Sequence, residues 1–163
     1  MTRRAKEPLM KLFGVILPAL IVLAGCGHDH STHDDGDLCD DSQQTRSFEL
    51  GSTLTSEDGR YFLTIDSSEP NPIGRGDNSW TVNLKDNAGN PVSDAKLVLE
   101  PTMPEHGHGT FPPLFLGAAG DVSGVFQLGP FDLIMPGTWP MNFTITGSDE
   151  ATSRITVAYC VAN

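Results

Sequence analysis

The chain has 163 residues and a net charge of −11 at neutral pH, from 21 acidic and 10 basic side chains. This length favours one domain of ordinary size, and no second domain is needed to bury a core. An acidic surface repels phosphate backbones, so we expect no nucleic-acid binding, whereas cations and basic partners would be attracted.

Residues 1–25 have the pattern of an export signal. Basic side chains are followed by an apolar run from Leu12 to Ala24, which is too short for a permanent membrane span. The sequence LAGC that ends at Cys26 matches a bacterial lipobox, in which the cysteine is lipidated and becomes the new N-terminus. We therefore expect a lipoprotein anchored to the membrane through Cys26, in the bacterial envelope and facing the periplasm or the exterior. The alternative is that LAGC is only the apolar end of the signal.

Residues 26–46 form the second predicted segment. They contain almost no apolar side chains, so burial cannot offset the chain entropy, and a flexible tether is expected. His28, His30 and His33 lie among aspartates here. This tract is either a solvated acidic linker or a weak binder of Zn²⁺ or Cu²⁺.

Cys39 and Cys160 remain after lipidation of Cys26. Two cysteines in an exported chain favour a disulfide. A bridge that closes a loop of this length would stabilise the fold by on the order of 4–5 kcal/mol. The alternatives are two free thiols or a thiolate metal site.

Residues 47–163 are predicted to form one all-β domain. Runs of β-branched and aromatic residues are separated by turn signals, as in a sandwich or barrel. Alternating apolar residues predict strands at 61–65, 80–84, 95–99, 139–145 and 155–159, with two further strands at 122–128 and 131–135. Turns are expected at 67–78, 86–92, 117–120 and 135–137. These features predict a single β-sandwich of about seven strands.

The segment MPEHGHG at 103–109 concentrates potential metal ligands. It places the thioether of Met103 and the imidazoles of His106 and His108 within six residues. Its proline and glycines oppose a helix and weaken any strand. Thioether sulfur is a soft donor that suits Cu(I), and imidazole binds either oxidation state of copper. We therefore predict a copper site in this loop.

A fourth ligand would come from another part of the chain. Met135, in the turn MPG, is preferred to Met141 on the following strand, although methionine also fills gaps in cores. If the ion were zinc, Glu105 or water would replace the methionines. The alternative without a metal is that both histidines are exposed turn residues.

Two strings of the sequence resemble the YtkA-like domains of bacterial envelopes and, more distantly, the FixH-like proteins. They are PVSDAKLVLEPTMPEHGHGT and FDLIMPGTWPMNFTI. The matching positions are Gly89, Pro91, Val92, Ala95 and Val98, then Met103, Pro104, His106 and His108, then Met135, Gly137 and Trp139. Leu97 between Lys96 and Val98 makes the first block only approximate. The resemblance covers roughly residues 60–160 and implies an immunoglobulin-like sandwich, often tethered to a membrane and in some members linked to copper handling or cytochrome oxidase assembly.

No enzyme is expected, because the sequence has no nucleophile elbow, no phosphate-binding loop and no CxxC motif. We predict a lipoprotein that binds a metal ion or delivers it to a metal-accepting or other envelope protein. Copper is the metal that the donors favour. One alternative is a structural or interaction module whose MPEHGHG loop contacts a partner. Another is a binding domain for a small organic solute.

Overall fold

The computed structural model describes Cys39 and residues 45–162. The predicted signal, the predicted lipidation site at Cys26 and most of the predicted tether, including its three histidines, lie outside the described residues. Within the described part of the chain, no helix is long and apolar enough to cross a membrane.

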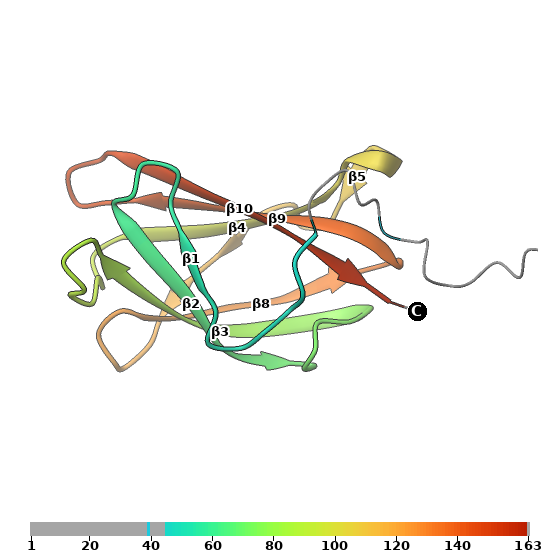
Figure 1. Ribbon diagram of the computed structural model, residues 1–163, viewed down its shortest axis with the longest axis horizontal. Coiled ribbons are helices and arrows are strands. Elements are labelled where there is room, and N and C mark those ends of the chain that lie inside the picture. The colour runs from blue at the N-terminus through green and yellow to red at the C-terminus, as the bar shows by residue number, and fades with distance from the viewer. Residues whose placement is uncertain (1–38, 40–44, 163) are drawn as a thin grey trace, which may run out of the picture. The chain divides into compact units, whose positions relative to one another are not determined.

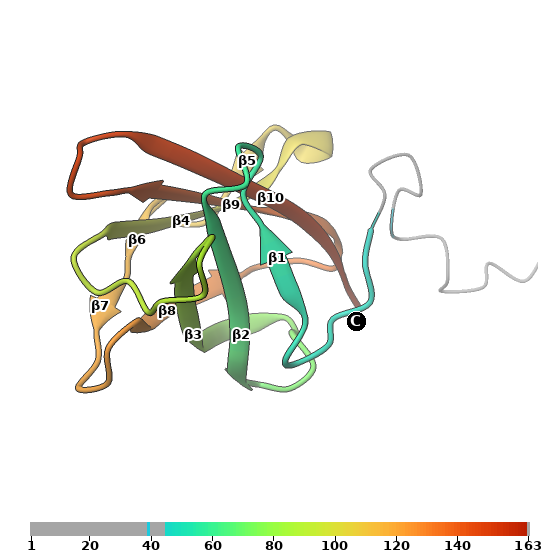
Figure 2. The same ribbon diagram turned by 60° about the vertical axis from the view of Figure 1, so that its left-hand side comes forward.

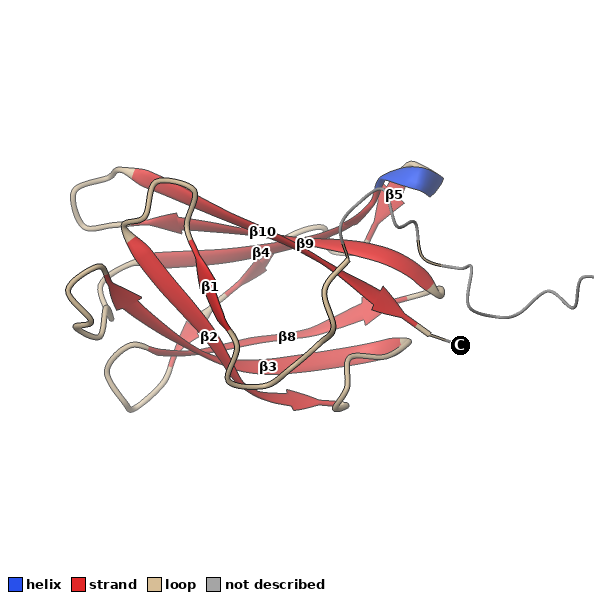
Figure 3. Ribbon diagram, in the orientation of Figure 1, coloured by secondary structure: helices blue, strands red, loops and turns tan. Residues whose placement is uncertain are grey.

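Two five-stranded sheets form a β-sandwich (Figures 1 and 3). The first sheet has the order β1 (Thr53–Thr55), β2 (Tyr61–Glu69), β3 (Gly76–Asp86), β8 (Val125–Leu133) and β7 (Ala118–Ala119). The second has the order β10 (Thr152–Val161), β9 (Gly137–Thr146), β4 (Lys96–Met103) and β5 (His108–Gly109), with β6 (Phe115–Leu116) also paired to β4. The all-β sandwich is confirmed. The described residues form ten strands and not about seven. Two of the predicted strands are one strand, β8, and four short strands were not predicted: β1 has three residues and β5, β6 and β7 have two each, too few to show a periodic pattern.

The alternating residues of the long strands build the core between the sheets. Trp80, Val82 and Leu84 of β3 are fully buried, as their spacing predicted. The ring of Trp80 lies 5.0 Å from that of Phe131 on β8 and 6.2 Å from that of Phe143 on β9. Both sheets therefore pack on one central indole.

The region 122–135 forms one strand where the sequence predicted two. Gly129 and Pro130 look like a strand break, yet β8 continues through them to Leu133. Gly129 has a φ of 103°, and a Cβ there would lie 2.5 Å from the Asn78 carbonyl oxygen. The pairing of β3 with β8 shifts register between Asn78 and Trp80, opposite this point. The Gly-Pro pair thus makes a bulge and does not end the strand.

The predicted turn at 86–92 is present but does not join neighbouring strands. Lys85 pairs with Pro91, and Val92 N–H donates to the Leu84 carbonyl, as at the base of a hairpin. The chain then crosses to the second sheet, where β4 pairs with β9. This crossover brings the chain to the 103–109 loop (Figure 2).

The predicted disulfide between Cys39 and Cys160 is confirmed, with Cα atoms 5.6 Å apart. Cys160 lies on β10 opposite Thr138 of β9. Arg46 pairs with Tyr159 in parallel, and its N–H donates to the Ala158 carbonyl over 2.8 Å. The start of the domain is therefore held along the end of β10 by both a covalent bond and a backbone hydrogen bond.

Asp58 joins the β1–β2 turn to β10. Its carboxylate accepts hydrogen bonds from Ser153 Oγ at 2.6 Å, Ser56 Oγ at 2.7 Å and Arg60 N–H at 3.2 Å. These bonds favour the charged form, and the Ser153 hydroxyl contributes most to lowering the Asp58 pKa from 3.8 to about 2.

A lowered pKa gives Asp58 a pH-dependent effect on stability. The contribution is present above the ordinary pKa of 3.8 and is lost as the pH falls towards about 2. We expect the thermal midpoint of Asp58→Asn to fall less than that of the native chain between about pH 4 and about pH 2. Asp121→Asn, a change at an exposed loop residue, is the control. Equal falls in Asp58→Asn and the native chain would contradict this assignment.

Candidate metal site

The 103–109 loop is a compact turn with a short strand, where the sequence predicted neither helix nor regular strand. Residues Pro104–His106 form a single 3₁₀ turn. Gly107 ends it with a left-handed φ of 67° and donates its N–H to the Pro104 carbonyl. Strand β5 then pairs back on β4, with His108 opposite Met103. A Cβ on Gly109 would lie 2.7 Å from the Pro101 carbonyl oxygen, so glycine permits this close return.

This pairing places two predicted ligands on one face. Directly opposed residues of an antiparallel pair have their side chains on the same side of the sheet, with Cβ atoms about 4.5–5.5 Å apart. Met103 is fully buried at the end of the core, and His108 beside it is partly buried. His106 is exposed, and its ring centroid is 5.9 Å from that of His108. The structure therefore brings Met103, His106 and His108 into one neighbourhood, with Met103 on the inner side.

The Nδ1 atom of His108 is buried and has no hydrogen-bond partner. Leaving a buried polar atom unpaired costs roughly 1–3 kcal/mol, so such atoms need an explanation. A ring nitrogen that binds a metal keeps its lone pair for the ion and needs no other partner. The state of this atom fits a metal ligand on a residue that pairs directly with Met103.

Trp139 connects the loop to Met135. Its ring centroid lies 6.5 Å from that of His108, and its Nε1–H donates to the Met135 carbonyl oxygen over 3.0 Å. The β8–β9 turn that contains Met135 therefore lies at the same end of the sandwich as β5 (Figure 1). Met135 itself is partly buried and packs against the core. It is linked to Trp139 by its backbone carbonyl and not by its thioether.

The other two candidate metal ligands, Met141 and Glu105, do not lie with the grouped donors. Met141 is fully buried opposite Pro101, as a core residue. Glu105 is exposed on the 3₁₀ turn. Among Cys39 and residues 45–162, no group of three or more His, Cys, Asp or Glu side chains is arranged to hold a metal ion. The donors that lie together are thus one thioether and two imidazoles.

The sequence predicted Trp139 as an inward strand residue and as a position of the YtkA-like pattern, but not as a contact between the loop and the turn. Its role in linking loop and turn was missed because alternation predicts burial but not the partners of a polar atom. A usable signal was present, since a buried indole N–H requires an acceptor and the MPGTW string places a turn carbonyl four residues earlier.

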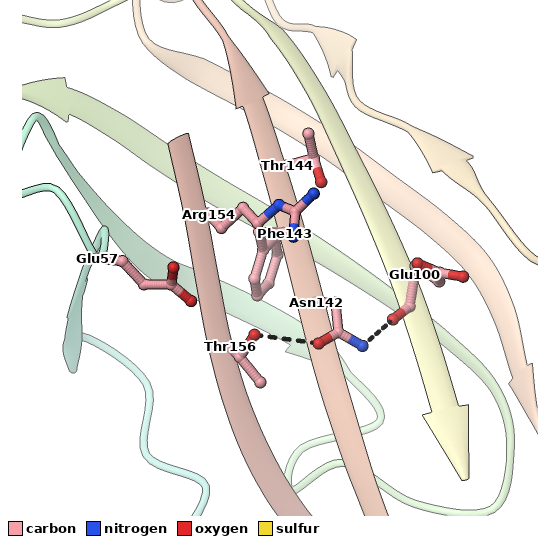
Figure 4. A pocket seen from close by; sticks show the side chains of 7 residues that line it. All are labelled: Glu57, Glu100, Asn142, Phe143, Thr144, Arg154 and Thr156. Carbon is pink, nitrogen blue, oxygen red and sulfur yellow. Dashed lines mark hydrogen bonds between the residues drawn. The ribbon is translucent and has the colours of Figure 1, made fainter. Parts of the chain in front are cut away.

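A separate pocket lies on the outer face of the second sheet (Figure 4). It is lined by Glu57, Glu100, Asn142, Phe143, Thr144, Arg154 and Thr156. Asn142 accepts a hydrogen bond from Thr156 Oγ1 and donates to the Glu100 carbonyl, each over 3.1 Å. These bonds connect β10, β9 and β4, and none of the predicted metal ligands lines this pocket.

Comparison with known families gives one match. The family described as YtkA-like matches residues 56–144, more than half of the chain. The matched region contains the whole 103–109 loop, the β8–β9 turn and Trp139. No curated protein and no solved structure matches the chain.

Proposed function

This chain belongs to the YtkA-like family, and on that basis we propose that it binds Cu(I) at the 103–109 loop and passes it to another envelope protein. The observation that carries the proposal is the buried, unpaired Nδ1 of His108, a residue that pairs directly with Met103 across β4 and β5. One soft sulfur and one imidazole nitrogen on a common face suit a Cu(I) ion.

The exposure of His106 supports transfer of the copper ion to a partner rather than its permanent storage. His106 lies outside the buried pair, with its ring 5.9 Å from that of His108. An incoming ion would meet His106 first and then the inner pair, and an acceptor protein would reach it by the same route. The acidic charge of the chain favours the approach of cations.

Anchoring forms the second part of the proposal. Residues 1–25 act as a lipoprotein signal and Cys26 carries the lipid, which places the domain in the envelope, facing the periplasm or the cell exterior. Radiolabelled palmitate should be incorporated into the native chain and not into Cys26→Ser.

The proposal is tested by competition titration of Cu(I) against a chromogenic chelator, with the chain that starts at Gly27, because an unlipidated Cys26 thiol would itself bind Cu(I). We expect one tight site. In His106→Ala/His108→Ala, two of the three grouped donors are lost, so the affinity should fall by at least about 100-fold, equivalent to about 2.7 kcal/mol. Met103→Leu should weaken binding by about tenfold, because it removes the sulfur while nearly keeping the side-chain volume.

Two controls separate this site from its rivals. Met141→Leu changes a fully buried methionine of the same sheet and should leave the affinity unchanged. Replacing His28, His30 and His33 with alanine should also leave the tight site intact. Unchanged affinity in the His106/His108 variant would refute the site, and tighter binding of Zn²⁺ than of Cu(I) would refute the choice of metal.

A further inference from the structure

Three large apolar side chains stand out from the surface directly after the metal loop. Phe111 is 94% exposed, Leu114 53% and Leu116 65%. Single exposed apolar residues are normal, but three within six residues indicate a contact surface. We call this set the apolar ridge.

The ridge is held in place by buried neighbours. Thr110 is buried, and its Oγ1 donates to the Pro112 carbonyl over 3.0 Å. Phe115 is also buried, with its ring centroid 5.8 Å from that of Phe131. Leu116 pairs with Val98 through β6. Because both ends of the 110–116 segment are fixed, its backbone loses little further freedom when a partner binds, which favours affinity.

The charges around the ridge indicate what kind of partner it fits. No Lys or Arg occurs between Lys96 and Arg154. The charged residues on either side of the ridge in the sequence, Glu105 and Asp121, are acidic and exposed. On β4, which pairs with β6, the exposed Lys96 and Glu100 lie two residues on either side of Val98, the partner of Leu116. Three of these four charges are therefore acidic. A second copy of the chain would bring the same negative charges together, and an anionic bilayer would also be repelled.

We propose that the apolar ridge docks a basic protein, whose surface offers an apolar depression surrounded by Lys or Arg. Phe111 is the central anchor, because an exposed aromatic ring that enters a pocket is a typical source of binding energy. Glu105 contributes to the acidic border that steers the partner into place. The inference stands on the ridge and its charges, whether or not the neighbouring loop binds metal.

The experiment places a photo-crosslinker, p-benzoylphenylalanine, at position 111 of the full chain in its native host. After irradiation the adducts are purified and identified by mass spectrometry. We expect one protein with a net positive charge at neutral pH. The same crosslinker at Val122, which is 65% exposed in a loop away from β5, is the control and should not give this adduct.

The identified protein is then purified and titrated with variants of the chain. Phe111→Ser should bind at least about tenfold more weakly. Glu105→Lys should also weaken binding and reduce its dependence on salt, whereas Glu49→Lys, an exposed acid before β1, should change it less. Adducts with a second copy, with lipid or with an acidic protein, or no adduct at all, would overturn the proposal.

Discussion

Replacing Trp80 with alanine is expected to lower the free energy of unfolding by about 3–5 kcal/mol. The indole is fully buried and donates its Nε1–H to Ser68 Oγ over 3.0 Å. Its ring also packs against aromatic rings from both sheets and from the segment before β1, those of Phe48, Phe131, Phe143 and Tyr159. Alanine would leave a cavity at the centre and a hydroxyl without its donor.

Guanidinium unfolding of the oxidised chain measures this effect. Because domains have about 5–15 kcal/mol of total stability, Trp80→Ala should lose a large part of it. Phe111→Ala is the matched control: it also removes an aromatic ring, but one that is 94% exposed, and should change stability by no more than about 0.5 kcal/mol. Equal losses in the two variants would show that Trp80 is not the centre of the core.

Serine at both Cys39 and Cys160 is expected to lower stability by on the order of 4–5 kcal/mol. The bridge joins residues 121 positions apart, so it greatly restricts the unfolded chain. It also fixes the start of the domain to β10 beside Thr138, one residue from Trp139.

A reductant separates the effect of the disulfide on stability from the effect of the serine substitutions themselves. The unfolding midpoint of the native chain should fall when dithiothreitol is added, towards that of the double serine variant. The variant itself should not respond to the reductant. A native midpoint that is unaffected by reduction would mean that the bridge contributes little.

The long strands could be predicted from the sequence because they obey a simple rule. Residues such as Trp80, Val82 and Leu84 alternate between core and surface, and burial of one face is the main energetic demand on a strand. The disulfide was also predictable, because the predicted lipidation of Cys26 leaves one pair of cysteines in a chain that is predicted to be exported. The two-residue strands are too short to show a periodic pattern. Gly129 and Pro130 are typical of a strand end, and the bulge that they form instead depends on the pairing with Asn78 of β3, which the local sequence does not show.

The local grouping of the candidate ligands could be predicted from the sequence, but their tertiary arrangement could not. Residues close in sequence, such as His106 and His108, can be grouped by inspection. The opposition of Met103 and His108 depends on the chain reversing at Gly107 and returning along β4, which is a tertiary pairing. The link from His108 through Trp139 to Met135 depends on three separate elements and could not be read from spacing.

The inner position of Met103 refines the predicted copper loop. The sequence predicted three donors in one loop without distinguishing their burial, whereas the structure buries Met103 and leaves His106 exposed. The Met103 thioether lies away from water and the His106 imidazole lies at the surface, so we expect the two residues to have different roles. The inner pair would hold Cu(I), and the outer histidine would exchange it.

X-ray absorption spectroscopy of the Cu(I)-loaded chain tests this arrangement most directly, because it identifies the atoms bound to copper. The predicted spectrum shows both nitrogen and sulfur neighbours, with the sulfur signal reduced in Met103→Leu and unchanged in Met141→Leu. A copper environment of nitrogen and oxygen alone in the native chain would contradict the proposed site.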